Sequence, residues 1–150
     1  MGIITKLNLL KLRLQSQLKL IHIKKNKNIN IARDTTIYEN VQIETNYGGS
    51  ITIGSNNEIL YGACLMTYGG KIDIGNNCSI NPYTIIYGHG KGVKIGNNVL
   101  IAGHTMIIPS NHIYTSLHNP INQQGSTSKG IIIEDDVWLG SGVKVLDGVT

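Results

Sequence analysis

Histidine and tryptophan are the side chains in this sequence best suited to chemistry, with five of the first and one of the second. His112 lies in a polar stretch between Asn111 and Tyr114. An imidazole there could take up a proton near neutral pH, because its unperturbed pKa is about 6.5. By position alone, a polar loop histidine without a role is the simpler interpretation. Three further histidines could ligate zinc together with water: His89, His104 and His118.

The elements that must position these side chains belong to one domain, since the chain has 150 residues. It holds 25 Ile, 18 Gly and 16 Asn but no Phe and only three Pro. So much Gly argues against a helical bundle, and the excess of β-branched Ile argues for strands rather than disorder.

Charge is distributed unevenly along the chain. Residues 1–28 contain seven Lys or Arg and no acid, whereas residues 29–150 contain six basic and nine acidic residues, a net charge of 6 − 9 = −3. The main body is therefore not a nucleic-acid surface. Two cysteines make no disulfide framework, and Cys64 and Cys78 are expected to be structural thiols. No signal peptide or membrane-spanning stretch is recognisable, so we expect a cytoplasmic protein.

A repeat runs through residues 31–150. Ile74-Gly75-Asn76-Asn77 recurs as Ile95-Gly96-Asn97-Asn98, and Ile53-Gly54-Ser55-Asn56 and Ile133-Glu134-Asp135-Asp136 approximate it. Aliphatic residues then step by six within five sets: Ile31, Ile37, Ile43; Ile53, Ile59, Leu65; Ile74, Ile80, Ile86; Ile95, Ile101, Ile107; Ile133, Leu139, Val145. Three hexapeptides and a corner make one three-sided coil, so these sets should stack inside a parallel β-helix.

Two further features support a β-helix. The position four residues after each anchor is small or β-branched, as a second interior position should be: Thr35, Val41, Ala63, Cys78, Thr84, Val99, Thr105, Val137, Val143 and Val149. Gly and Asn after the anchors suit corners, because both tolerate a left-handed backbone.

One interval is longer than the others. Ile133 begins 38 residues after Ile95, against 21 or 22 elsewhere. The excess predicts a loop over 111–129, and a loop of that length in so regular a repeat is more often functional than accidental.

Residues 1–28 predict a basic amphipathic helix. Its apolar positions follow helical spacing: Ile3, Leu7, Leu10, Leu14, Leu18 and Ile21, with Lys6, Arg13 and Lys24 elsewhere. The favoured interpretation is a cap on the end of the β-helix, which leaves 29–150 as the β-helix domain. The alternative is a helix resting on the inner face of an anionic membrane.

Several motifs together resemble bacterial hexapeptide-repeat acyltransferases, and in particular sugar O-acetyltransferases of exopolysaccharide and O-antigen pathways. They are the Ile-Gly-Asn-Asn hexapeptides, Asn111-His112-x-Tyr114, Pro120-Ile121-x-x-Gln124-Gly125, Thr127-Ser128-Lys129 and the run from Ile133 through Trp138 to Gly140. The resemblance implies an all-β, left-handed parallel β-helix, assembled as a homotrimer with active sites between subunits.

The resemblance also implies roles for individual residues. His112 matches the catalytic base that removes the proton from a sugar hydroxyl as it attacks the thioester of acetyl-CoA. Asn81, with Asn111 and Tyr114, would bind the acceptor, which is a sugar, a nucleotide-sugar or a lipid-linked glycan. Trp138, Gly140 and Ser141 would line the cofactor slot, and Lys129 could meet a phosphate. Attack is direct, so we expect no metal.

Two other functions remain open. Relatives continue for about two coils beyond Thr150 and use them to bind coenzyme A, so this chain could instead be a truncated, non-catalytic trimeric scaffold. Some left-handed β-helix proteins are zinc carbonic anhydrases, although the histidine spacing here matches them poorly.

Overall fold

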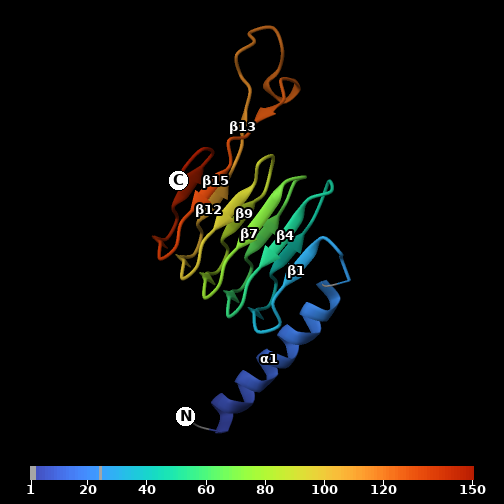
Figure 1. Cartoon of the computed structure of the whole chain (residues 1–150), viewed down its shortest axis with the longest axis vertical. Coiled ribbons are helices and arrows are strands. Elements are labelled where there is room, and N and C mark those ends of the chain that lie inside the picture. Colours follow the sequence, from blue (N-terminus) through green and yellow to red (C-terminus); the bar gives the residue numbers. More distant parts are fainter. Residues whose placement is uncertain (1–2, 24) are drawn as a thin grey trace.

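The protein is a five-coil β-helix with one helix at its base and one long loop at its opposite end (Figure 1). The computed structural model describes residues 3–23 and 25–150, with the side chains of 7, 8, 10–23 and 25–150. The predictions that concern the side chains of Ile3, Lys6 and Lys24 lie outside this part. The expected left-handed parallel β-helix is confirmed, so its crossovers reverse the usual right-handed rule.

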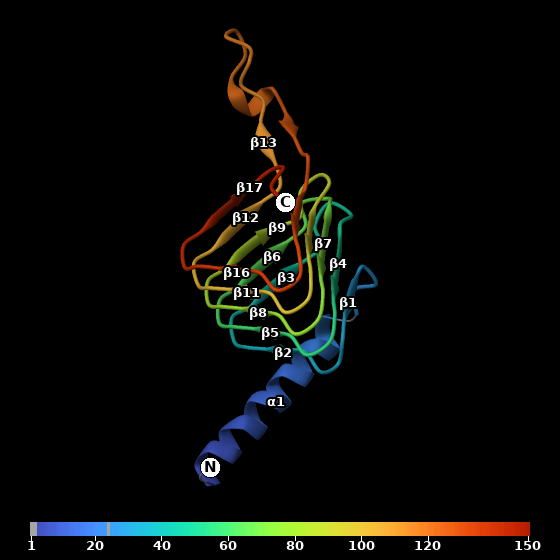
Figure 2. The ribbon, with the colours of Figure 1, turned by 60° about the vertical axis from the view of Figure 1, so that its left-hand side comes forward.

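Each coil contributes one strand to each of three parallel sheets, which we call A, B and C (Figure 2). Sheet A contains β1 (Ile29–Ile31), β4 (Ser50–Ile53), β7 (Lys71–Ile74), β10 (Val93–Ile95) and β15 (Ile131–Ile133). Sheet B contains β2 (Thr36–Ile37), β5 (Glu58–Ile59), β8 (Ser79–Ile80), β11 (Leu100–Ile101) and β16 (Trp138–Leu139). Sheet C contains β3 (Gln42–Glu44), β6 (Cys64–Met66), β9 (Ile85–Tyr87), β12 (Met106–Ile108) and β17 (Lys144–Leu146).

The predicted aliphatic sets stack in register inside the coil. Ile53 pairs with Ile74, and Ile74 pairs with Ile95, which in turn pairs with Ile133 across the long interval. The interior becomes less enclosed in the last coil, where Leu139 is half-buried. Val149 was expected inside but is 46% exposed, because it follows the last strand of the last coil.

The corners between sheets are also aligned from coil to coil. We call them the A–B corner (32–35, 54–57, 75–78, 96–99 and 134–137), the B–C corner (38–41, 60–63, 81–84, 102–105 and 140–143) and the C–A corner (45–49, 67–70, 88–92 and 109–130). The left-handed backbone expected at these corners is found at the third position of the A–B corner, where Asn56, Asn77, Asn98 and Asp136 have φ between 55° and 60°. The glycines at the first position, Gly54, Gly75 and Gly96, do not have it. The long loop leaves the fold at the C–A corner.

Helix α1 (Ile3–Ile23) covers the first coil with its C-terminal half. The hydroxyl of Ser16 accepts a hydrogen bond of 2.8 Å from the backbone N–H of Ile37, at the otherwise unpaired edge of sheet B. Leu20 is 2% exposed beside it, and Ile23 packs against the same core. The helix therefore caps the coil, but the predicted apolar stripe is not the face that does so.

Candidate active site

His112 lies at the base of the long loop, which we call the excursion (109–130). Strand β13 (Asn111–His112) pairs antiparallel with β14 (Ser126–Thr127), so that His112 lies opposite Ser126. All four residues of this ribbon are exposed. His112 and Asn111 are therefore presented to solvent on a paired strand rather than on a free loop.

The excursion is fastened where it leaves the coil. Ser128 accepts a hydrogen bond of 3.0 Å from the backbone N–H of Lys91 and donates one of 2.6 Å to the carbonyl oxygen of Pro109. Position 90, at the C–A corner of the coil below, must be glycine, because a Cβ there would overlap Ser128. On the other side, the carboxylate of Asp147 accepts hydrogen bonds from the backbone N–H groups of Lys129 and Gly130.

Gln124 organises the outer part of the excursion. Its side chain accepts a hydrogen bond from the backbone N–H of Ser116, and it donates to the carbonyl oxygens of Ser116 and Asn119. Gln124 of the motif Pro120-Ile121-x-x-Gln124-Gly125 therefore has a structural role in the excursion. Tyr114 is 74% exposed, so its phenol ring is free to contact a ligand or a neighbouring molecule.

Asn81 lies at the start of the B–C corner, directly after β8. Its amide group donates a hydrogen bond of 3.0 Å to the carbonyl oxygen of Ile101 and a longer one of 3.4 Å to the hydroxyl of Ser79. These bonds hold the half-buried side chain in one orientation. Within the described residues its Oδ1 accepts no hydrogen bond, so this oxygen can accept one from a ligand.

Trp138 and Ser141 lie on the same side of the coil as Asn81. Trp138 is 75% exposed on the outer face of sheet B, and it stands in register with Leu100. The hydroxyl of Ser141 donates a hydrogen bond of 2.9 Å to the carbonyl oxygen of Gly103. That hydroxyl proton is therefore engaged, whereas the backbone N–H of Ser141 donates no hydrogen bond within the described part of the chain.

One chain does not bring these two groups of residues together. Asn81, Trp138, Gly140 and Ser141 flank the B–C corner, whereas Asn111, His112, Tyr114 and Lys129 belong to the C–A corner. Sheet C separates the corners. Six residues lead from Ser141 to Asp147 at the root of the excursion, and an extended chain rises about 3.3 Å per residue, so the two ends of this segment lie at most about 20 Å apart.

Sequence reasoning missed an aromatic stack at the B–C corner. The rings of Tyr83 and His104 are stacked with centroids 5.4 Å apart and an interplanar angle of 17°. Both residues have the left-handed backbone, with φ of 59° and 61°, which costs a side chain with a Cβ about 1 kcal/mol or more. The other face of Tyr83 lies over Gly62, where a Cβ would come within 2.6 Å of the ring.

The residue types at this corner position, compared from coil to coil, could have indicated the stack. The same corner position holds Asn40 in the first coil, Gly62 in the second and Gly142 in the fifth, and all three have positive φ. Aromatic residues at a position that favours Gly or Asn mark a site where a ring is kept in spite of the backbone cost.

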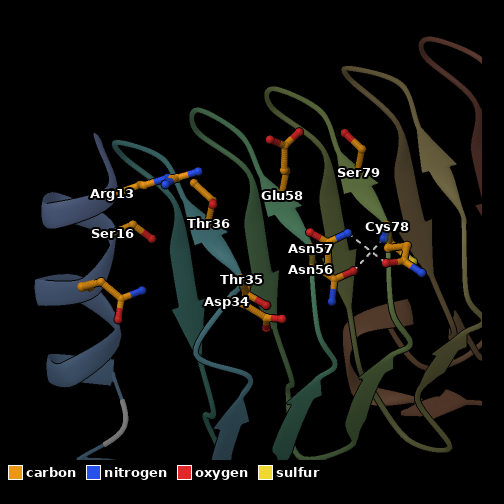
Figure 3. Close-up of a pocket in the computed structure, with 12 residues that line it drawn as sticks. Arg13, Ser16, Asp34, Thr35, Thr36, Asn56, Asn57, Glu58, Cys78 and Ser79 are labelled. Atoms are coloured by element: carbon orange, nitrogen blue, oxygen red, sulfur yellow. Dashed lines mark hydrogen bonds between the residues drawn. The ribbon is translucent and has the colours of Figure 1, made fainter. Parts of the chain in front are cut away.

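A surface cavity of about 640 Å³ lies between α1 and the A–B corner of the first three coils (Figure 3). It contains none of the predicted site residues. Asn57 is 1% exposed here, and its amide donates to the carbonyl oxygens of Gly54 and Gly75 while its oxygen accepts from the N–H of Cys78. These polar groups satisfy one another, so this wall of the cavity is structural.

The histidines and cysteines form no metal site within the described residues of one chain, which contain no group of three or more His, Cys, Asp or Glu able to hold an ion. His89 and His104 lie at different corners, and His118 lies on the excursion. Cys64 and Cys78 are free thiols, and burial raises the pKa of both. Both therefore stay protonated at neutral pH, as expected of structural thiols.

Comparisons with known proteins support the fold. No family model matches the chain, and no curated protein matches it in sequence. A solved structure of AntD, an N-acyltransferase from Bacillus cereus in complex with dTDP and 3-hydroxybutyryl-CoA, is 21% identical with a TM-score of 0.69. A mutant of AntD with dTDP-4-amino-4,6-dideoxyglucose and coenzyme A is 20% identical with a TM-score of 0.66. Both matches cover 87% of this chain and 70% of the other. The chain therefore shares the β-helix fold of these N-acyltransferase structures.

Proposed function

We propose that this chain is the subunit of a homotrimeric acetyltransferase that transfers an acetyl group from acetyl-CoA to a hydroxyl group of a sugar in a surface-polysaccharide precursor. The motif around His112 and the run through Trp138 support this activity. The fold it shares with AntD, whose structures contain coenzyme A and a dTDP-sugar, supports an acyl-CoA donor and a sugar acceptor.

The observation that carries the proposal is the position of the two groups of site residues at opposite edges of sheet C. The outer face of the three middle strands of sheet C, β6, β9 and β12, is apolar and half-buried, whereas the outer positions of β3 and β17 are exposed. Its apolar members stand in register: Cys64, Met66, Ile85, Tyr87, Met106 and Ile108.

Three copies that turn sheet C toward a three-fold axis would cover this face. Each C–A corner would then meet the B–C corner of the next subunit. Such heterologous contacts close into a ring when the rotation is three-fold. In this arrangement His112 of one subunit faces Asn81, Trp138 and Ser141 of its neighbour, which completes a site that one chain leaves divided.

In the proposed reaction each of these site residues has one role. The sugar hydroxyl, held by Asn81 Oδ1 with help from Asn111 and Tyr114, attacks the carbonyl carbon of the thioester while His112 takes its proton. The backbone N–H of Ser141 meets the negative charge that develops on the carbonyl oxygen. The carbon–sulfur bond then breaks, and the coenzyme A thiolate takes the proton back from the imidazolium. Trp138 and Gly140 bound the pantetheine arm, and Lys129 meets a phosphate.

The first test is a titration of the 150-residue protein with acetyl-CoA by calorimetry, with the molar mass measured by light scattering in the same buffer. We expect a trimer that binds in the micromolar range. A well-folded trimer without detectable binding would overturn the enzymatic proposal in favour of a scaffold. A stoichiometric zinc content by elemental analysis would favour a hydratase instead.

The acceptor atom needs a separate assay. Neutral sugars and sugar nucleotides that carry hydroxyl groups alone are compared with a dTDP-amino sugar, and the products are identified by mass spectrometry. Acetyl esters are the expected products. Acetylation of the amino sugar alone would show that this chain transfers to nitrogen, as its structural neighbours do by name.

A further inference from the structure

Helix α1 has two opposite apolar faces, of which the β-helix covers only one. Ser16, Leu20 and Ile23 lie against the first coil. The opposite face carries five large aliphatic side chains, which we call the outer stripe: Leu7 (59% exposed), Leu10 (65%), Leu14 (62%), Leu18 (61%) and Ile21 (64%). The described part of the chain therefore contains a continuous apolar stripe three to four turns long with nothing packed on it.

The charges around the outer stripe are all of one sign. On a helix of 3.6 residues per turn, Lys11 lies along one edge of the stripe and Arg13 lies toward the other. Residues 1–28 contain no acidic residue, and Lys25 and Lys27 follow the helix directly. The remainder of the chain has the opposite charge, −3 over residues 29–150.

We propose that the outer stripe docks α1 on a lipid surface that contains anionic headgroups. An apolar face bordered by cations and free of acids has the chemistry of a helix that lies in the interfacial plane, with its long basic side chains reaching the headgroups. No helix in the described residues is long and apolar enough to cross a membrane. The helix would thus rest on the bilayer without spanning it.

A second copy of α1 fits the same surface less well. Two outer stripes packed together would bring the basic edges of both helices side by side, and residues 1–28 offer no carboxylate to neutralise them. Anionic headgroups supply that charge. The proposed trimer does not use this face either, because its contacts lie along sheet C.

The docking orientation follows from the fold. Helix α1 lies at the base of the β-helix and the excursion lies at the opposite end (Figure 1). A bilayer under α1 would therefore leave His112 on the far side, open to acceptors. The inference rests on the helix alone and stands whether or not the protein transfers acetyl groups.

The experiment is a sedimentation assay of the full chain with two kinds of vesicle, phosphatidylcholine alone and phosphatidylcholine mixed with phosphatidylglycerol. We expect binding to the mixed vesicles, weakened by added salt because the attraction is partly electrostatic. Leu14→Glu and Lys11→Glu should each reduce the binding about tenfold or more. The matched control is Leu117→Glu, since Leu117 is 97% exposed on the excursion and should leave binding unchanged.

Three outcomes would overturn the proposal: no binding to either vesicle, equal binding to both, or equal loss with Leu117→Glu. If the wild type does not bind vesicles and the Leu14→Glu variant no longer forms the wild-type oligomer, the outer stripe is instead a contact between subunits. Circular dichroism checks folding of each variant. These results are independent of the acetyl-CoA titration, so failure here and failure of the enzymatic proposal are told apart.

Discussion

Ser128 and Pro109 join the two ends of the excursion through a hydrogen bond of 2.6 Å from the serine hydroxyl to the proline carbonyl oxygen. This bond closes the loop at its root, next to the ribbon that carries His112, because Pro109 lies two residues before Asn111 and Ser128 directly follows Thr127. The position of the proposed base thus depends on a contact made within the excursion itself.

Ser128→Ala should lower kcat without weakening acetyl-CoA binding. Loss of the root contact lets the ribbon shift, and a displacement of about 1 Å at a reacting group can cost as much as 10²-fold in rate. Steady-state kinetics and calorimetry measure the two quantities. Ser126→Ala is the matched control, because Ser126 faces His112 on the ribbon and its hydroxyl makes no hydrogen bond within the described residues. Equal losses in both variants would contradict a positioning role.

His112→Ala should reduce turnover by about 10²-fold or more and leave the trimer and its acetyl-CoA affinity nearly unchanged, because a general base acts only in the chemical step. The matched control is His118→Ala, a second exposed histidine of the same excursion. An unchanged rate in His112→Ala would remove this residue from the mechanism.

Trp138→Ala should weaken acetyl-CoA binding by about tenfold or more, because a large aromatic ring that loses contact with a ligand removes much of the local binding energy. Calorimetry measures the change. Leu100→Ala, which alters the neighbouring position of the same outer ladder on sheet B, should have a much smaller effect. Retained affinity in Trp138→Ala would place the coenzyme elsewhere.

Asn57→Ala should lower the free energy of unfolding by about 3 kcal/mol or more, since it leaves two buried carbonyl oxygens and one N–H without their side-chain partner. Asn56→Gly should cost about 1 kcal/mol or less, because Asn56 is exposed and donates only to Asn77, and glycine accepts its left-handed backbone. Urea unfolding of both variants tests the difference, and similar losses would contradict the structural role given to Asn57.

Asp135 gives a prediction for acid stability. Hydrogen bonds from the backbone N–H and side chain of Asn97 lower the pKa of this carboxyl below its ordinary value. The ionised form is thus favoured in the folded state. Its contribution to stability is present above the unfolded pKa of about 3.9 and is lost as pH falls through the lower folded pKa.

Asp135→Asn tests this sign. Asn76 and Asn97 make the same contact in the coils below, so an asparagine preserves the ladder without a titrating group. Unfolding of the variant should therefore depend less on pH in the acid range than unfolding of the wild type. Parallel curves for the two proteins would show that Asp135 carries no such contribution.

The interior of the fold was predictable because a period of six leaves one choice of register. Once Ile53, Ile74 and Ile95 share a face, the other stacked aliphatic positions follow. The buried residues two places before the anchors, such as Ile51 and Ile72, were not among the predicted interior positions, and Val149 is exposed. The face that α1 turns to the coil was not predictable, because the helix is apolar on two sides. The choice depends on a tertiary contact, the hydrogen bond between Ser16 and the backbone of Ile37, which helical periodicity does not encode.

The candidate site was predictable only in parts. Spacing places Asn81 and Ser141 after the second strand of a coil and His112 after the third. The distance between these two corners depends on the width of sheet C, which the spacing does not give. The stack of Tyr83 on His104 depends on left-handed backbone at two non-glycine residues, which tertiary packing imposes.

The even stacking of the coils fixes the distance between α1 and the excursion. Neighbouring strands of a sheet lie about 4.8 Å apart, so the four steps from β1 to β15 set a height of about 19 Å. Because the interior register repeats identically, this height can change only by whole coils. Deletion of one coil would move His112 about 5 Å closer to the base, while the strands on either side of the deletion would pair with each other in the same register.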